Sequence, residues 1–234
     1  ALVTGSDIIF FWVARMIMAG YEFMGKAPFA HVFITSIVRD AEGRKMSKSL
    51  GNSPDPMEMM DRHGADAVRF SLIYLTPMGQ DLIFDEKRIE TGRFFANKVW
   101  NAARLVSLRL GDEDVGRIKE SQLTLTLADR WILSRFANAV KDVTRCLKTY
   151  RLSEAANALY HFTWNEYCDW YLEFAKPRWA DDAEPATRRA ARWVGWKVLD
   201  GVLRMLHPFM PFVSEEIWQA IPHAGATRAL AAWP

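Results

Sequence analysis

The pattern of apolar and polar positions changes along the chain and predicts three regions. In the first, residues 1–40, a short apolar run ends at Gly5, a run that is apolar nearly all round covers Ile8–Met18, and a β-branched stretch covers His31–Val38. Apolar runs of strand length on either side of a helix are typical of parallel strands. We therefore expect a strand–helix–strand unit of a parallel sheet, in which Asp7 caps a buried helix.

The second region, residues 41–122, opens with a basic loop rich in Gly and Ser at residues 43–52. Helical patterns follow the loop. They cover residues 55–63, where Asp followed by Pro marks the start, then residues 66–75 and 85–110. This region is therefore predicted to be a loop followed by helices.

The third region, residues 123–234, is helical throughout and carries no strand pattern. A capping box formed by Thr126 and Asp129 and a cap at Ser153 mark two of the helix starts. The predicted helices cover residues 131–150, 153–176, 185–207 and 213–220, and residues 111–121 form the expected linker. Short polar connections indicate an antiparallel bundle, so the predicted class is α/β followed by all-α.

Composition excludes several kinds of site. A net charge of +2 over 234 residues is too small to indicate nucleic-acid binding by itself. The two cysteines, Cys146 and Cys168, fit a reducing cytoplasm and exclude a Cys-rich zinc site. The five histidines show no metal-ligand spacing, and we expect no metal site formed by the protein. Residues 8–14 are too few to span a membrane, so no membrane partner is expected.

The loop carries the strongest chemical signal. Lys45 and Lys48 flank Ser47, and Gly43 and Gly51 bracket all three. Two ammonium groups on a flexible loop suit a polyphosphate whose charge must be neutralised, and ligands gather beyond the carboxyl ends of parallel strands. A plain solvated loop is the alternative.

The string Lys45-Met46-Ser47-Lys48-Ser49 is identical to the KMSKS signature, and the chain therefore resembles the class I aminoacyl-tRNA synthetases. The resemblance implies the C-terminal part of a Rossmann-like catalytic domain that uses ATP with Mg²⁺. It also implies catalytic roles for two lysines, with Lys48 as the principal ligand of the ATP phosphates and Lys45 assisting. Met46 and Ser47 would belong to the same ATP site.

Residues 4–16 are similar to the valyl, isoleucyl and leucyl branch of that class, and most similar to the valyl enzymes. The resemblance implies that Gly5 and Asp7 lie against the ribose of ATP and that Trp12 lines the amino-acid pocket. Two alternatives remain open, namely that Asp7 is only a helix cap and that Trp12 is ordinary core. Ser6 departs from the family pattern, in which an aromatic residue is expected.

Residues 129–135 and 164–173 resemble the anticodon-binding helices of the valyl enzymes. The implied domains are the end of the catalytic domain at residues 1–40, the KMSKS loop with a stem-contact helical region at 41–122, and the anticodon-binding bundle at 123–234. Valine, ATP and tRNA(Val) are the implied partners of a monomer.

Three basic residues of the second region, Arg93, Lys98 and Arg104, recur at helical spacing. The resemblance places this segment near the inner corner of tRNA, where Arg and Lys contact phosphates. A solvated helix face is the alternative.

The chain begins at Ala1 without Met, and we expect it to be a piece of a longer protein. It contains neither the family's His-Ile-Gly-His-like motif nor an editing domain, so we expect the chain alone to be inactive. Two further hypotheses stay open: a piece of an isoleucyl or leucyl enzyme, and a tRNA-binding module without catalysis.

Overall fold

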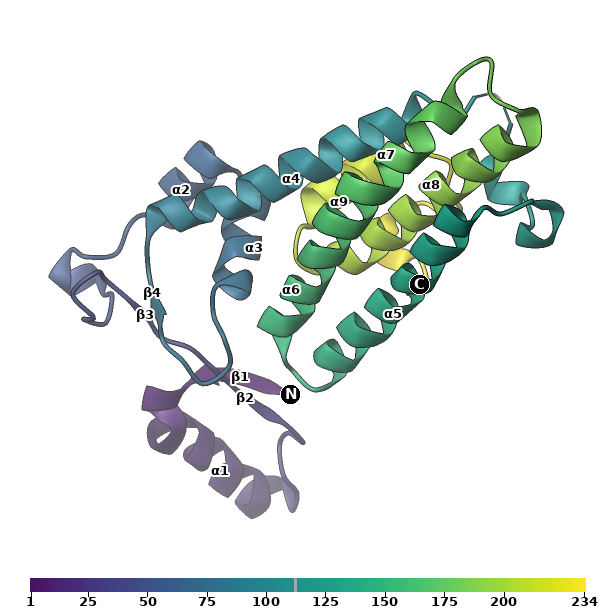
Figure 1. Cartoon of the computed structure of the whole chain (residues 1–234). Coiled ribbons are helices and arrows are strands. Elements are labelled where there is room, and N and C mark those ends of the chain that lie inside the picture. Colours follow the sequence, from purple (N-terminus) through teal and green to yellow (C-terminus); the bar gives the residue numbers. More distant parts are fainter. Residues whose placement is uncertain (112) are drawn as a thin grey trace.

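The structure is a computed structural model that describes residues 1–111 and 113–234. Figure 1 shows a small α/β part at the N-terminal end, a long helix, α4, and a bundle of helices packed along it. The predicted class, α/β followed by all-α, is confirmed. In the part of the chain that is described, no helix is both long and apolar enough to cross a bilayer.

The α/β part contains two parallel strands joined by a helical crossover. β1 (Leu2–Gly5) pairs with β2 (Val32–Thr35) along the full length of both strands. Between them the chain forms a 3-10 turn (η1, Ser6–Ile8), a π-helical segment (η2, Ile9–Ala14) and α1 (Arg15–Met24). Parallel pairing requires such a crossover, and the predicted strand–helix–strand unit is confirmed.

The prediction of a buried helix at residues 8–18 is wrong. Phe10 is 82% exposed and Phe11 is 70% exposed, whereas Val13 is buried. An apolar run indicates that a helix can face other apolar groups, but it does not say which segment supplies them. Figure 1 shows α1 at the edge of the molecule, on the side of the strands away from the bundle. The predicted cap is also wrong, because Asp7 lies inside η1 and its side chain does not cap it.

The strand predicted over residues 31–38 is divided in two. After β2, the chain turns into β3 (Val38–Arg39), which pairs in parallel with β4 (Leu82–Ile83). The carboxylate of Asp81 accepts a hydrogen bond from Arg39 Nε at 2.6 Å and so ties the two short strands together. This second pair fixes the point from which the basic loop begins.

Three helices lead from the loop to the bundle, as predicted. They are α2 (Pro56–His63), α3 (Ala65–Tyr74) and α4 (Glu86–Ser107). Asp55 caps α2 and Asp85 caps α4, each by accepting from the backbone N–H two residues further on, at 2.8 and 3.0 Å. These caps satisfy donors that a helix start leaves free.

Close packing of α3 on α4 depends on Gly92. A Cβ at that position would lie 2.5 Å from the carbonyl oxygen of Ala67, so a larger residue would push the helices apart. The hydroxyl of Ser71 accepts from Gly92 N and donates to the Ile89 carbonyl, both at 3.2 Å. The contact sets the direction in which α4 leaves the α/β part.

The remaining helices form the predicted bundle, in which α5 and α6 are joined by a tight turn (Figure 1). In order they are η4 (Val115–Arg117), η5 (Glu120–Gln122), α5 (Leu127–Lys148), α6 (Leu152–His161), η6 (Phe162–Tyr171), α7 (Leu172–Ala175), η7 (Lys176–Trp179), α8 (Pro185–Leu206), α9 (Pro211–Gln219) and η8 (Arg228–Leu230).

The helix predicted over residues 153–176 is present as the succession of α6, η6 and α7. Its predicted cap is wrong, because Arg151 is the N-cap and Ser153 lies inside the first turn. The hydroxyl of Ser153 donates instead to the carbonyl of Tyr74 at 3.1 Å, and thus ties α6 to α3. Ser favours helix starts in general, and here a partner distant in sequence takes its hydrogen bond.

One hydrophobic core joins α3 and α4 to the bundle and extends from Phe70 to Ile221. The segment predicted as a linker, residues 111–121, contributes to it: Val115 and Ile118 are buried. The indole N–H of Trp193 donates to the Ile118 carbonyl at 3.1 Å. Position 112 of the segment lies outside the described residues.

Asp129, in the first turn of α5, has a fully buried carboxylate. It accepts hydrogen bonds from the Tyr171 hydroxyl at 2.8 Å and from two nitrogens of Arg178 at 2.8 and 2.7 Å, and it forms the predicted capping box with Thr126. Burial alone would raise the pKa of Asp129, but these hydrogen bonds outweigh burial and the pKa is lowered. The carboxylate thereby joins α5, η6 and η7.

We expect Asp129→Ala to lower the free energy of unfolding by about 3–5 kcal/mol, because it leaves the guanidinium of Arg178 buried without its anion. Asp142→Ala is the matched control, since Asp142 of the same helix pairs with Arg145 at an exposed site and such pairs contribute little. Urea unfolding followed by tryptophan fluorescence measures both variants. Equal losses in the two would contradict the role given to Asp129.

Candidate nucleotide-binding site

The basic loop leaves β3 as a tight hairpin. Arg39 and Lys45 form an antiparallel bridge, and the backbone N–H of Asp40 donates to the Arg44 carbonyl at 2.9 Å. Gly43 turns the chain with a φ of +79°, a conformation that glycine adopts without strain. The hairpin thus brings Lys45 back beside Arg39, the last residue of β3.

Two polar residues close the base of the loop. Asp40 is 7% exposed, and its carboxylate accepts three hydrogen bonds of 2.8 Å, from Arg44 N, Arg44 Nε and Asn52 Nδ2. The amide oxygen of Asn52 accepts from Ser47 N at 2.9 Å. The hydrogen bond from Asn52, opposed by burial and reinforced by Arg44, lowers the pKa of Asp40 to about 2.

The tip of the loop is a single 3-10 turn, η3 (Lys48–Leu50). The hydroxyl of Ser47 caps it by accepting from Leu50 N at 3.3 Å, and Gly51 ends it with a φ of +66°. Lys48 is exposed at the start of this turn, and Met46, two residues earlier, is half-buried. The loop thus presents Lys48 to solvent from a short, capped segment.

Lys45 reaches across to the end of β1. Its ammonium nitrogen lies 2.5 Å from the carboxylate of Asp7, and this hydrogen bond lowers the pKa of Asp7. Gly5 makes room for the carboxylate, because a Cβ at that position would lie 2.7 Å from Asp7 Oδ1. The structure therefore brings Gly5, Asp7 and Lys45 together at the carboxyl end of β1, where ligands bind in parallel sheets.

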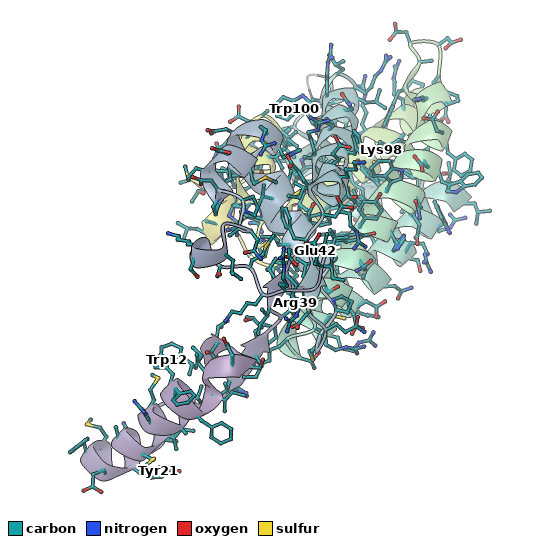
Figure 2. All side chains as sticks on the ribbon, turned by 90° about the vertical axis from the view of Figure 1, so that its left-hand side faces the viewer. Trp12, Tyr21, Arg39, Glu42, Lys98 and Trp100 are labelled. Atoms are coloured by element: carbon teal, nitrogen blue, oxygen red, sulfur yellow. The ribbon has the colours of Figure 1, made fainter. Side chains whose placement is uncertain are left out.

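Trp12 lies in η2 and is 43% exposed, so the core alternative does not describe it. Figure 2 shows Trp12 on the segment that projects from the strands, far from Lys98 and Trp100 on α4. Arg39 and Glu42, at the base of the loop, lie between these two ends of the view.

The three basic residues predicted to contact tRNA lie along α4, away from the loop. Lys98 donates to Asp169 at 2.6 Å and lies over the ring of Trp164 at 5.0 Å, so its charge is used within the protein. Arg93 pairs at 3.5 Å with a glutamate one turn earlier in α4. Arg104 is exposed, and in residues 1–111 and 113–234 it has no ion pair.

An apolar cavity of about 510 Å³ lies between β2, α3 and the turn that joins α5 to α6. At this turn Tyr150, with a φ of +60°, packs its ring 5.6 Å from that of His31 and 5.9 Å from that of Phe33. The charged lining residues Arg151 and Glu154 pair with each other. Among the described residues that line the cavity, none offers phosphate a free cation, and none belongs to the loop at residues 43–52.

Within the described ranges, no group of three or more His, Cys, Asp or Glu side chains is placed to hold a metal ion. Both cysteines are free and buried, and burial raises the pKa of Cys168 to about 12. A thiol with such a pKa stays protonated and unreactive at neutral pH.

Asp40 and Asn52 were missed by the sequence reasoning. An Asp that precedes a glycine by three residues signals a turn, and this signal was available for Asp40. Asn52 gives no comparable local signal, because its partners lie five and twelve residues away.

Comparisons with known proteins identify the class. A family model described as tRNA synthetases class I (I, L, M and V) matches residues 1–85, and one described as the anticodon-binding domain of tRNA ligase matches residues 129–234. The chain belongs to the class I tRNA synthetases. Within this class the chain is similar over its whole length to several valine–tRNA ligases.

The valine–tRNA ligases of Fusobacterium nucleatum subsp. nucleatum and Thermotoga maritima are each 50% identical to this chain. That of Carboxydothermus hydrogenoformans is 52% identical. Each comparison covers 100% of this chain and 26% of the relative, so the chain spans about a quarter of the length of these proteins.

Two solved structures share the fold. The Agrobacterium radiobacter K84 agnB2 LeuRS, in a ternary complex with tRNA and LeuAMS, has a TM-score of 0.79 at 23% identity, over 99% of this chain and 28% of its own. The Mycobacterium tuberculosis methionyl-tRNA synthetase in complex with methionyl-adenylate has a TM-score of 0.72 at 25% identity, over 92% of this chain and 42% of its own.

We expect Asp7→Asn to raise the rate at which Lys45 is acetylated by a few-fold, because the exposed amine loses its anionic partner. The wild-type chain should react faster at Lys48 than at Lys45, and the difference should shrink in the variant. Peptide mass spectrometry after brief labelling measures both sites. Asp61→Asn, an exposed change on α2, should leave the ratio as it is, and an unchanged ratio in Asp7→Asn would show that the pair does not form.

Proposed function

We propose that this chain is the part of a valine–tRNA ligase that supplies the KMSKS loop of the ATP site and the helical tRNA-binding bundle. The supporting observation is the loop itself, which is anchored at its base and carries Lys45 and Lys48. Lys45 meets Asp7 at the carboxyl end of a parallel strand. The whole enzyme would use ATP to activate valine and transfer it to tRNA(Val).

In the first step the carboxylate of valine attacks the α-phosphorus of ATP. The bond from the α-phosphorus to the bridging oxygen breaks, and pyrophosphate leaves with the negative charge. Lys48 and Lys45 stabilise this charge as it develops, with Met46 and Ser47 holding the backbone that presents them. Mg²⁺ would arrive with the nucleotide, since it is commonly bound through phosphate oxygens and few carboxylates.

Asp7 is suited to accept a hydrogen bond from a ribose hydroxyl, because its carboxylate stands beyond the end of β1 and beside Gly5. In the structure this carboxylate is paired with Lys45. Nucleotide binding would therefore exchange one contact for two, with Asp7 turning to the ribose and Lys45 to the phosphates. Trp12 would line the pocket for the valine side chain.

The three parts of the chain would have separate tasks. Residues 1–40 would end the catalytic domain, residues 41–122 would carry the loop and the stem-contact helices, and residues 123–234 would bind the anticodon arm. The reducing cytoplasm suits the two free, buried cysteines. We propose a monomer as the working unit, because the loop and its partner Asp7 belong to one chain.

We expect Lys48→Ala in the full-length enzyme to lower valine-dependent ATP–pyrophosphate exchange by about 100-fold or more, and Lys45→Ala by a smaller factor. Removal of one preorganised charge from a transition state typically costs about 10²–10³ in rate. Lys141→Ala, an exposed lysine of α5, is the control.

Exchange with valine compared to isoleucine and leucine tests the amino acid. Faster exchange with isoleucine or leucine would identify the related enzymes instead. If the full-length protein binds tRNA but exchanges no pyrophosphate with any amino acid, a tRNA-binding module without catalysis would replace the proposal.

Arg104 and Lys98, two basic residues of α4, should contribute differently to tRNA binding. We expect Arg104→Ala to weaken binding to tRNA(Val) and to reduce the salt dependence by about one charge, as for a phosphate contact. Lys98→Ala should act mainly on stability, because Lys98 is tied to Asp169 and Trp164. Filter binding across a salt series and thermal unfolding separate the two effects, and equal salt slopes for both variants would refute this difference.

A further inference from the structure

The phosphate contacts proposed for the loop do not involve Asp40 or Asn52, the two polar residues at its base. We propose that Asn52 and Asp40 are positioning residues, which close the loop into a clamped ring and so fix the direction in which Lys45 and Lys48 approach the ATP phosphates. This inference rests on the proposed function. Neither residue touches the nucleotide in this proposal, and both act through the lysines.

The side chain of Asn52 joins three points of the loop. Its Nδ2 donates to the carboxylate of Asp40 at 2.8 Å and lies 3.4 Å from the carbonyl oxygen of Lys45. Its Oδ1 accepts from the backbone N–H of Ser47 at 2.9 Å. The residue therefore holds the chain before, within and after the Lys-Met-Ser-Lys segment, and both lysines lie inside the closed ring.

The chemistry of the clamp requires an amide at position 52. Asp40 is ionised over the whole range in which the protein would work, since its pKa is about 2. An ionised carboxylate only accepts hydrogen bonds, so its partner must donate, while the N–H of Ser47 requires an acceptor on the same side chain. Asparagine provides both groups at the length that the two distances allow.

Two glycines lie in the rest of the loop, and glycine permits backbone conformations that other residues rarely adopt. Gly43 and Gly51 both have positive φ, and the side chains between them are mostly exposed. Without the clamp, these glycines would let the loop sample many directions. An error of about 1 Å in the position of a catalytic group can cost about 100-fold in rate, so the clamp bears directly on turnover.

The test compares Asn52→Ala and Asn52→Asp in the full-length enzyme by valine-dependent ATP–pyrophosphate exchange. We expect Asn52→Ala to lower kcat by about 10- to 100-fold, with a smaller change in KM for ATP, because the lysines remain present but are misdirected. Asn138→Ala and Asn138→Asp are matched controls, since Asn138 is exposed on α5. Wild-type kcat in Asn52→Ala would overturn the proposal.

The pH profile of Asn52→Asp provides a second readout that loss of fold would not imitate. The new carboxyl would face the anion of Asp40, with Arg44 on the other side of Asp40 and Glu42 beyond it. The nearby anion raises the pKa of the new carboxyl, which can donate to Asp40 only while it is protonated. Activity relative to wild type should therefore fall as pH rises, and a flat ratio would contradict the clamp.

Hydrogen exchange at the Ser47 amide separates this inference from the proposed function. In the wild-type enzyme the amide should be protected, and Asn52→Ala should speed its exchange at least about tenfold, whatever the enzyme activates. If the wild-type enzyme shows no valine-dependent ATP–pyrophosphate exchange, the proposed function fails, but the hydrogen-exchange measurement at Ser47 still tests the clamp. If the wild type is active in ATP–pyrophosphate exchange but the Ser47 amide exchanges hydrogen equally fast in wild type and Asn52→Ala, only the clamp is overturned.

Discussion

The carboxylate of Asp129 is the constraint on which the helical part of the molecule depends. A buried anion is tolerated only where its lost hydration is replaced, and here Arg178, Tyr171 and Thr126 replace it. Because these partners belong to η7, η6 and the start of α5, their geometry fixes how the three segments meet. η6 in turn holds α4 through the ion pair of Asp169 with Lys98. The contacts of Asp129 thus also help to fix the position of α4, the long helix that runs toward the α/β part (Figure 1).

Local signals were sufficient where the partners of a residue are close in sequence. The capping box of Thr126 and Asp129, the cap at Asp55 and the parallel strands around a helix all follow from spacing. Sequence-based prediction was wrong where a segment distant in sequence determines the hydrogen-bond partner or the burial of a residue. Serine is a residue type that often caps helices, but the hydroxyl of Ser153 donates its hydrogen bond to the carbonyl of Tyr74 instead. The apolar run after β1 was expected to be buried, yet Phe10 and Phe11 are exposed because periodicity does not specify what covers a face.

The candidate site divides in the same way. The loop residues themselves predict the chemistry proposed for it, and a comparison of short strings is enough to expect Lys45 and Lys48 there. Their surroundings are tertiary: Asp7 lies 38 residues from Lys45, and Asn52 lies 12 residues from Asp40. No periodicity or composition brings these pairs together, because only the parallel pairing of β1 with β2 and the hairpin after β3 place them side by side.

The loop has two requirements that conflict, and its structure assigns them to different residues. The base must be fixed so that the lysines point in one direction, and it is held by Asp40, Asn52 and the contact of Asp81 with Arg39. Under the proposed function, Lys45 must also be able to leave its contact with Asp7 when phosphates bind. The pair of Lys45 with Asp7 meets this need because both side chains are about half exposed, where water and ions compete with the contact. A buried pair of the kind that Asp129 forms would hold Lys45 too firmly to be exchanged. Under the proposed function, the difference in burial between these two ion pairs therefore separates the part of the chain that stays fixed from the part that responds to a ligand.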